Sequence, residues 1–251
     1  MYFPFFFSPR SLFVSTLVVC LLAASSAMAG SFGVSPIRLD FDRGTKTGVI
    51  TVTNDDESRL TFQMRLMTWS QDAKGVDQYA DSSDLIFFPL IMTLEPKEKR
   101  IIRVGTKSPP STSERTYRLF IEEIPDAAEA KLQGTAVAVK LRFGVPLFIA
   151  PVKVEKSGTI IDPRLAKGEV QVTIKNSGNQ HFRFENIAVK AGGTTMGEVA
   201  GWYLLAGAER AYTIKVDKDA CAKASKLEVA LSAEGLDLKR ELEVAPALCR
   251  P

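Results

Sequence analysis

The stretch that decides the fold is Thr135-Ala136-Val137-Ala138-Val139-Lys140-Leu141-Arg142-Phe143-Gly144-Val145. Every second residue from position 137 to position 145 is large and apolar, and small or basic residues alternate with them. Because successive side chains of a strand point to opposite faces, the pattern predicts a long β-strand with one apolar face. This strand is either an ordinary half-buried part of an all-β domain or an edge strand that lends its apolar face to another protein.

Short alternating segments separated by turn residues precede this strand and predict more strands. We expect strands over residues 36–41, 48–53, 60–69, 85–88, 99–104 and 116–124, and a loop or single turn over residues 126–131. Seven short strands with turn chemistry between them are typical of an immunoglobulin-like sandwich. Since proline cannot serve a central strand, Pro146 and Pro151 are expected to end the strand, and we place the domain boundary near residue 150.

The rest of the chain repeats the all-β pattern. Strands are expected over residues 170–174, 182–184, 202–205, 212–216, 227–231 and 236–244, with a hairpin turn at Gly192-Gly193. The predicted fold class is therefore all-β with two immunoglobulin-like β-sandwich domains, one over residues 30–150 and one over residues 151–251.

The first 29 residues have the pattern of a cleavable secretion signal. Arg10 supplies a positive charge, an apolar core follows over residues 12–24, and Ala27-Met28-Ala29 forms a small-x-small cleavage site. The apolar core is too short to span a bilayer, so we expect secretion without stable membrane insertion.

Cysteine usage and charge fit a secreted protein. Cys20 lies in the signal, so Cys221 and Cys249 remain, and they are expected to form one disulfide in an oxidising compartment. The formal net charge of +3 is too balanced to predict nucleic-acid binding.

The sequence gives little support for catalysis, a cofactor or a metal. His181 is the only histidine, and neither a nucleophile elbow nor a phosphate-binding glycine loop is present. Glu122 and Glu123 are neighbours on a predicted strand and would face opposite ways. The acidic residues at 55–57 lack the further ligands of a calcium loop. We therefore expect a protein that is not an enzyme.

The apolar face of the opening strand carries no charge or proline along nine residues. An exposed edge of this kind promotes aggregation unless it is protected or used. One use is β-augmentation, in which the backbone pairs with a partner strand and the alternating side chains fill the partner's pockets.

Several short motifs, in a fixed order, carry a resemblance to a known family. They are Pro36-Ile37-Arg38-Leu39-Asp40-Phe41, Leu94-Glu95-Pro96, Ile102-Arg103-Val104, Tyr117-Arg118-Leu119 with Glu123-Ile124-Pro125, Leu147-Phe148 before Pro151, and a weaker match at Trp202-Tyr203-Leu204-Leu205-Ala206-Gly207. In these motifs the chain resembles the periplasmic pilus chaperones, the PapD-like proteins of the chaperone–usher pathway.

The resemblance implies two immunoglobulin-like domains in an L or boomerang arrangement. It also implies a periplasmic chaperone that holds pilin subunits by donor-strand complementation and delivers them to an outer-membrane usher for pilus assembly, without a nucleotide. The donated side chains would be Val137, Val139, Leu141, Phe143 and Val145. Self-association of the free chaperone through the same strand is left open.

The resemblance further implies that two basic residues anchor the carboxylate at the C-terminus of the subunit. By this resemblance the first falls on Arg38, where a guanidinium could pair with both oxygens of a carboxylate. Pro146 occupies the second position, so Arg118, Lys140 and Arg142 are the remaining candidates.

A second departure from the family concerns the ion pair between the domains. Ala150 replaces its basic partner, whereas Glu114 matches an acidic partner. With these departures the chain resembles a divergent branch of the family, similar to the archaic chaperones that serve spore-coat-like fimbriae.

A secreted structural pilus subunit or adhesin with immunoglobulin-like domains is the alternative. A subunit should carry a detachable N-terminal arm with alternating apolar residues. After the signal the chain begins Gly30-Ser31-Phe32-Gly33-Val34 and reaches its first predicted strand at once. The chaperone is therefore the favoured hypothesis.

Overall fold

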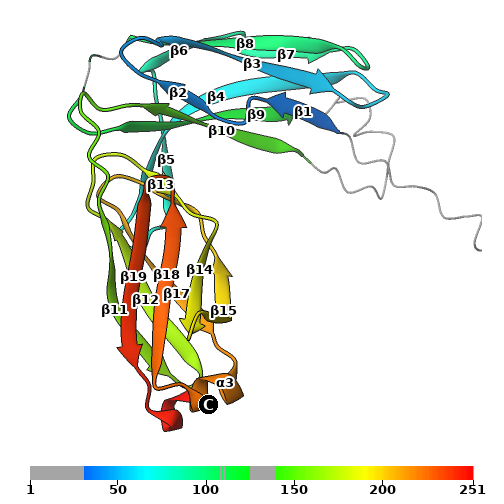
Figure 1. The fold of residues 1–251 in the computed structure, drawn as a ribbon. Helices are drawn as coiled ribbons and strands as arrows, with labels where there is room; N and C mark the ends of the chain where they lie inside the picture. The colour runs from blue at the N-terminus through cyan, green and yellow to red at the C-terminus, as the bar shows by residue number, and fades with distance from the viewer. Residues whose placement is uncertain (1–30, 108, 110, 125–139, 251) are drawn as a thin grey trace, which may run out of the picture. The chain divides into compact units, whose positions relative to one another are not determined.

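Two β-sheets make up the first half of the chain (Figure 1). The computed structural model describes residues 31–107, 109, 111–124 and 140–250. One sheet has the order β1-β3-β8-β6, and the other has the order β2-β10-β9-β4-β5 with β7 paired to β4. The strands are β1 (Phe32–Ser35), β2 (Leu39–Phe41), β3 (Thr47–Asn54), β4 (Leu60–Gln71), β5 (Asp77–Asp81), β6 (Leu85–Phe88), β7 (Ile91–Leu94), β8 (Lys99–Thr106), β9 (Arg115–Ile124) and β10 (Arg142–Ile149).

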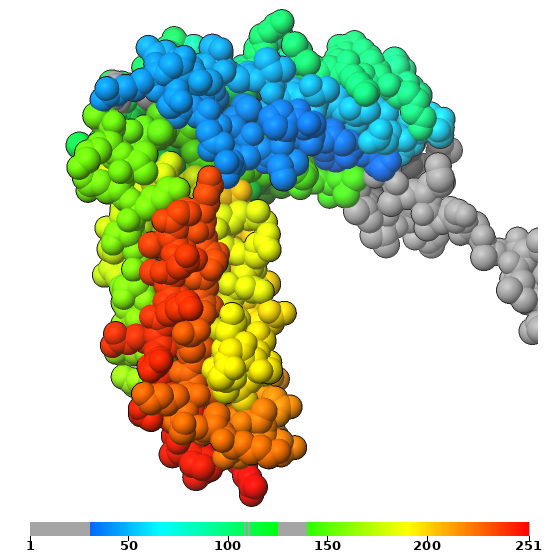
Figure 2. Space-filling model, viewed as in Figure 1, coloured from blue at the N-terminus to red at the C-terminus, as the bar shows by residue number. Residues whose placement is uncertain are grey.

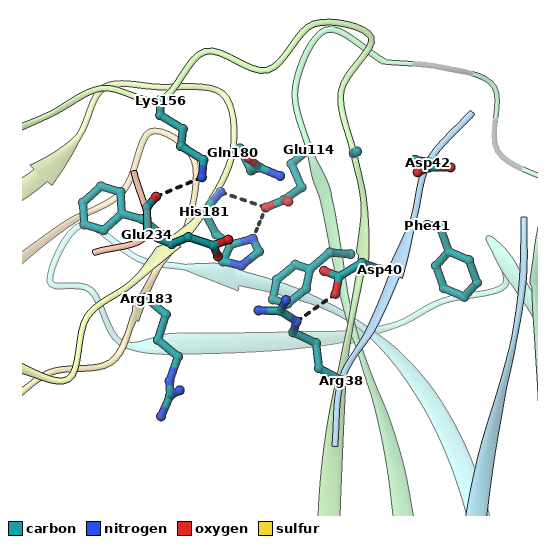
Figure 3. A pocket seen from close by; sticks show the side chains of 13 residues that line it. Arg38, Asp40, Phe41, Asp42, Glu114, Lys156, Gln180, His181, Arg183 and Glu234 are labelled. Carbon is teal, nitrogen blue, oxygen red and sulfur yellow. Dashed lines mark hydrogen bonds and ion pairs between the residues drawn. The ribbon is translucent and has the colours of Figure 1, made fainter. Parts of the chain in front are cut away.

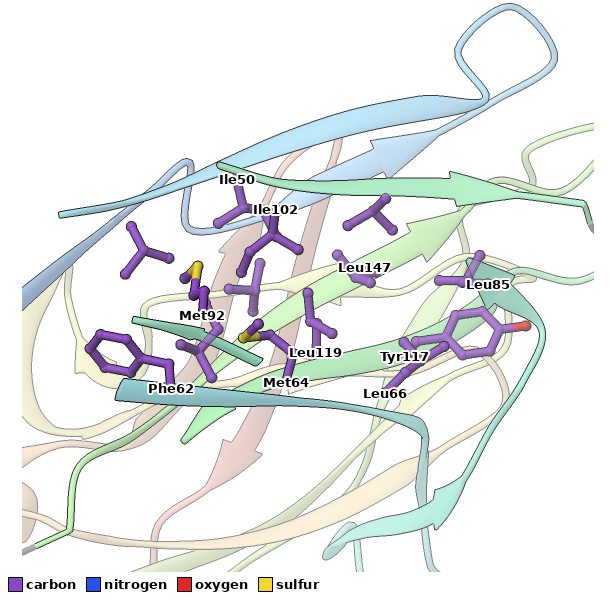
Figure 4. Close-up of a cluster of buried hydrophobic side chains, with 14 of the residues drawn as sticks. Ile50, Phe62, Met64, Leu66, Leu85, Met92, Ile102, Tyr117, Leu119 and Leu147 are labelled. Carbon is purple, nitrogen blue, oxygen red and sulfur yellow. The ribbon is translucent and has the colours of Figure 1, made fainter. Parts of the chain in front are cut away.

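Side chains from both sheets meet in one apolar core (Figure 4). In β4 the alternating residues Leu60, Phe62 and Met64 are buried, whereas Gln63 and Arg65 between them are exposed. This confirms the strand predicted over residues 60–69. The other sheet contributes Ile50, Val52, Ile102 and Val104 to the same core.

The strands predicted over residues 48–53, 85–88, 99–104 and 116–124 are also present, as β3, β6, β8 and β9. The segment over residues 36–41 differs from the prediction. Its strand β2 begins only at Leu39, and the unpredicted β1 pairs with β3 before it. Pro36 separates these two strands, because it has no N–H to donate to a ladder. The short strands β5 and β7 were not predicted. Residues 126–131 lie outside the described residues.

The second half is also built from strands, which pair only with one another among the described residues. Its sheets have the orders β11-β12-β17, β13-β16 and β15-β14-β18-β19. Figure 2 shows part of the last sheet as yellow, orange and red strands lying side by side. The strands are β11 (Gly158–Ala166), β12 (Glu169–Asn176), β13 (Phe182–Arg183), β14 (Asn186–Ala191), β15 (Thr194–Ala200), β16 (Tyr203–Leu204), β17 (Glu209–Lys215), β18 (Lys226–Ala233) and β19 (Leu236–Glu243).

The all-β prediction is thereby confirmed for both halves. Gly192 and Gly193 join β14 to β15, and both have positive φ values of 54° and 85°. Glycine adopts this region without steric cost, so the predicted hairpin turn is confirmed. Strands β11, β14 and β15 were not predicted, since their apolar residues alternate less regularly.

A buried asparagine closes an equivalent strand in each half. Asn54 ends β3 and Asn176 ends β12, and both are fully buried. The Nδ2 of Asn54 donates to the carbonyl of Leu94 at 3.2 Å, and the Nδ2 of Asn176 donates to the carbonyl of Leu204 at 3.0 Å. Each amide therefore satisfies carbonyl groups that the interior of the protein would otherwise leave without partners.

The predicted disulfide lies at the end of the second half. Cys221 and Cys249 are bonded, with their Cα atoms 5.8 Å apart, and both are fully buried. Cys221 lies on the short helix α3 (Lys218–Lys223), whose N-cap Asp217 accepts a hydrogen bond from the N–H of Ala220 at 2.8 Å. Cys249 ends the 3-10 turn η1 (Pro246–Cys249). The bond thus fastens the C-terminal turn to a helix that the sequence pattern did not reveal.

We expect the double change Cys221→Ala and Cys249→Ala to lower the free energy of unfolding by about 3 kcal/mol, because the bridge limits the unfolded chain. Urea titration followed by circular dichroism would measure this. The wild-type chain kept in dithiothreitol serves as the control and should unfold like the variant. Equal midpoints for the oxidised wild type and the variant would contradict this expectation.

Candidate functional site

Strand β10 is hydrogen-bonded along its whole length on one side and only at its end on the other. It pairs with β9 from Arg142, opposite Glu122, to Ile149, opposite Arg115. On the other side, β2 pairs with Leu147–Ile149 only. From Arg142 to Pro146, the second edge of β10 therefore has no partner strand in the described part of the chain.

The apolar face of β10 continues the core of the first sandwich. Val145 and Leu147 are fully buried in that core, Phe143 packs against it, and Leu141 just before the strand is half-buried. Val137 and Val139 lie outside the described residues. The alternation assigns Val145 to the donated side chains, but the structure instead places it in the chain's own core. The reason is that the sheet β1-β3-β8-β6 covers this face of β10.

Pro146 lies inside β10, although we expected the strand to end before it. The carbonyl of Leu141 accepts from the N–H of Glu123, so odd-numbered residues direct their backbone groups towards β9. The N–H of Ala150 donates to the carbonyl of Phe41, so even-numbered residues face the other edge. Pro146 consequently has its missing N–H on the open edge, where no ladder bond is lost.

Two of the candidate anchor residues flank Pro146, one on the adjacent strand β9 and one just before β2. Arg118 of β9 is directly opposite Pro146. Arg38 immediately precedes Leu39, which is paired with Leu147, so Arg38 comes beside Pro146 on its other side. The structure therefore brings Arg38 and Arg118 into one row across the sheet.

Arg118 is a buried cation without an ion-pair partner among the described residues. It is 7% exposed, and its guanidinium lies 4.0 Å from the centre of the Trp69 ring. One guanidinium N–H donates to the carbonyl of Gly144 at 2.9 Å, whereas Nε has no hydrogen-bond partner. A Cβ at Gly144 would lie 2.9 Å from the Phe120 ring, so only glycine leaves room here.

Arg38 lines a cavity of about 300 Å³ (Figure 3). Its Nε donates to Asp40 at 2.8 Å, and its side chain is 41% exposed. Arg183 lines the same cavity from the second half. The sequence pattern did not single out Arg183, because a lone exposed arginine carries no signal.

The other two candidates are less well placed for an anchor. The Nε of Arg142 lies 2.7 Å from Glu122, and its guanidinium lies 3.6 Å from the centre of the Phe120 ring. Lys140 is exposed and precedes β10. Neither residue lies beside Pro146.

A histidine–glutamate pair links the two halves at the same cavity. Oε2 of Glu114 lies 2.8 Å from Nδ1 of His181 and accepts from its backbone N–H at 2.9 Å. The His181 ring stacks on Phe148, with ring centres 3.7 Å apart. Glu114, the residue that matches an acidic partner, thus pairs with His181 rather than with a basic residue at position 150.

Among residues 31–107, 109, 111–124 and 140–250, no three His, Cys, Asp or Glu residues cluster as metal ligands would. No helix in these ranges is long and apolar enough to cross a membrane.

Residues 31–155 match the family model of the pili and flagellar-assembly chaperones, PapD N-terminal domain. The chain belongs to the PapD-like chaperones. The match covers β1 to β10, including the free edge of β10 and both arginines beside Pro146.

Two fimbrial chaperones are similar in sequence to most of this chain. The probable fimbrial chaperone LpfB of Escherichia coli O157:H7 is 26% identical over 182 residues, which is 72% of each chain. The probable fimbrial chaperone EcpE of Escherichia coli O127:H6 is 25% identical over 201 residues, which is 76% of this chain and 78% of EcpE.

Solved structures show the same fold. A CsuC–CsuE chaperone–tip adhesion subunit complex from archaic Csu pili of Acinetobacter baumannii has a TM-score of 0.60 at 21% identity, covering 84% of this chain and 97% of the matched one. The SafB chaperone with SafA pilin from Salmonella enterica has a TM-score of 0.57 at 13% identity, covering 86% and 99%. Family and fold together indicate a fimbrial assembly chaperone and a non-enzymatic protein.

We expect Glu114→Ala to lower the free energy of unfolding by about 2 kcal/mol, because two hydrogen bonds to a buried carboxylate are lost. Thermal unfolding followed by circular dichroism would measure the change. Glu155→Ala, which removes the exposed pair with Lys153, is the control and should leave the midpoint unchanged. Equal midpoints for both variants would contradict a stabilising role for the Glu114–His181 pair.

Proposed function

We propose that this chaperone holds pilin subunits in the periplasm by donor-strand complementation and delivers them to an outer-membrane usher. The free edge of β10 from Arg142 to Pro146 is the observation that carries the proposal. A subunit strand added there would form backbone hydrogen bonds with β10 and extend the sheet. The signal pattern of residues 1–29 supports a periplasmic location.

The donated side chains are Val137, Val139, Leu141 and Phe143. The last two have the same parity as Val145, so they lie on the strand face that is continuous with the core of the first sandwich. Leu141 and Phe143 are only half-buried and can gain contacts, whereas Val145 has none of its surface left to contribute. Each apolar side chain fully buried by a subunit contributes roughly 1.5–3 kcal/mol.

Arg38 and Arg118 are proposed to anchor the subunit's terminal carboxylate beside Pro146. A buried cation is normally paired, so the unpaired guanidinium of Arg118 favours an incoming anion. Arg38 is partly exposed and accessible from solvent. Arg118 of β9, directly opposite Pro146 in the ladder, then takes the place of the basic residue that is missing at position 146.

Two solved complexes of the same fold support a subunit as the partner. CsuC forms a complex with the tip adhesion subunit CsuE, and SafB forms a complex with the pilin SafA. The fold of this chain matches the two-domain chaperones, so the alternative of a structural subunit or adhesin is not favoured. Self-association through β10 would compete with subunit binding.

Leu141→Asp should weaken binding of a purified pilin subunit that lacks its N-terminal arm by at least tenfold, since a charge would enter the apolar groove. Isothermal titration calorimetry measures the affinity. Val154→Asp, at an exposed position outside the strands, is the control and should bind like the wild type. Unchanged affinity of the Leu141 variant would rule out strand donation.

Arg38→Ala and Arg118→Gln should each weaken binding of a subunit with a free C-terminal carboxylate by about tenfold, since each loses a charge-assisted hydrogen bond. The same subunit with an amidated C-terminus should bind equally to both variants and to the wild type. Arg142→Gln is the control, because Glu122 already engages this guanidinium. An equal loss for the amidated subunit would place the anchor elsewhere.

A further inference from the structure

The turn between β4 and β5 packs against the second half of the chain. Asp72 shapes this turn, because its Oδ1 accepts from the backbone N–H groups of Lys74 and Val76 at 2.8 and 2.9 Å. Gly75 in the same turn has a positive φ of 73°. A Cβ added there would lie 2.5 Å from the Cβ of Arg210 on β17, so only glycine allows this close approach. The turn and β17 are therefore in direct contact.

Gln71, the last residue of β4, binds the backbone of residues 202–205, named here the junction segment. Its Oε1 accepts from the N–H of Leu205 at 3.0 Å, and its Nε2 donates to the carbonyl of Tyr203 at 2.9 Å. These two groups lie on the edge of β16 that β13 leaves open, so the amide takes the place of a neighbouring strand. Nε2 also donates to Asp77 of β5 at 3.0 Å, which fixes the orientation of the amide.

The junction segment brings two aromatic residues to the arginines of the proposed anchor. The guanidinium of Arg118 lies 5.8 Å from the centre of the Trp202 ring, which is within cation–π range. Burial lowers the pKa of Arg38, but the Asp40 carboxylate and the Tyr203 hydroxyl raise this pKa by more. Each of the two arginines of the first half therefore has an aromatic neighbour from the second half.

Trp69 connects the junction segment to Arg118. Trp69 is 2% exposed and belongs to one buried cluster with Phe148 and Leu205. The Tyr203 ring packs edge to face against it, with ring centres 5.5 Å apart. On the same indole, the guanidinium of Arg118 lies 4.0 Å from the ring centre. The ring that carries the anchor arginine is therefore held by two residues of the junction segment.

The position of these arginines before binding affects the affinity for a carboxylate. An arginine side chain has several rotatable bonds and loses their freedom when it binds a ligand. Holding the side chain in its binding position beforehand raises the affinity without any new contact to the ligand. Gln71 forms no hydrogen bond with Arg38 or Arg118, so it acts on them only through the junction segment.

We propose that Gln71 is a positioning residue for the carboxylate anchor, because it holds the junction segment where Trp69, Trp202 and Tyr203 orient the two arginines. This inference rests on the proposed function, in which the anchor itself is proposed. It adds that the second half of the chain takes part in binding the subunit's terminal carboxylate, although the arginines that would contact the carboxylate belong to the first half.

Other hydrogen bonds join the two halves without the junction segment. Oε2 of Glu114 pairs with His181, and the N–H of Glu114 donates to the carbonyl of Asn179 at 2.8 Å. The Nδ2 of Asn179 also donates to the carbonyl of Thr112 at 2.9 Å. These bonds keep the halves together when Gln71 is changed, so its variants are expected to fold.

The test uses the purified chaperone and a subunit that lacks its N-terminal arm, with either a free or an amidated C-terminus. In isothermal titration calorimetry, Gln71→Ala should weaken binding of the free-carboxylate subunit about fivefold and leave binding of the amidated subunit unchanged. A purely structural role would weaken both equally. Gln63→Ala, at an exposed glutamine of the same strand, is the matched control and should bind both subunits like the wild type.

Two further variants make the result independent of a single substitution. Trp202→Leu removes the indole near Arg118 and leaves Gln71 in place, so it should also weaken only the free-carboxylate complex, by about threefold. When Gln71→Ala is added to a chain that already carries Arg38→Ala and Arg118→Gln, no further loss is expected, because no anchor remains to be positioned. Circular dichroism confirms that each variant is folded.

Three results would overturn the inference. Gln71→Ala and Trp202→Leu could both keep the full preference of the wild type for the free carboxylate, which would leave the anchor in place without a role for Gln71. An equal loss of affinity for both subunits would show that Gln71 only stabilises the fold. Equal binding of both subunits by the wild type would overturn the proposed anchor, and this inference with it.

Discussion

The one-sided pairing of β10 is the constraint on which the rest of the site depends. Eight residues of β10 are paired with β9, but only the last three are paired with β2. The same strand buries Val145 and Leu147 in the core. Its backbone edge from Arg142 to Pro146 has no partner strand among the described residues. The site is therefore not an addition to the sandwich, because the strand that completes the core also provides the edge.

In the proposed anchor, two arginines beside Pro146 keep a positive charge at this place in the sheet, although position 146 itself is not basic. A proline on the open edge loses no ladder bond and, because it cannot donate, also discourages a strand from pairing at this point. In the proposed anchor, Arg118 on the adjacent strand supplies the positive charge; its guanidinium lies over the Trp69 ring and donates to the carbonyl of Gly144. Spatial neighbours across strands can thus replace one another without similarity along the sequence.

Alternation in the sequence predicted long strands such as β4, which places its apolar residues on one buried face. It could not show where β10 ends, because tolerance of Pro146 depends on the direction of backbone groups and on a neighbouring strand. It also could not reveal the contact of His181 with Glu114, which joins residues 67 positions apart. The short strands β1 and β5 were not predicted. They have too few residues to show an alternating pattern, and they form because they pair with β3 and β4.

The ladder between β9 and β10 also has a mechanical consequence. A pull on the segment that precedes Arg142 would act along the axis of β10. Such a load would shear all the backbone hydrogen bonds between β9 and β10 together, whereas a pull across the sheet would break them one at a time. The buried side chains of Val145, Leu147 and Ile149 oppose the same sliding motion. The strand with an open edge from Arg142 to Pro146 is therefore also anchored against tension at its C-terminal end.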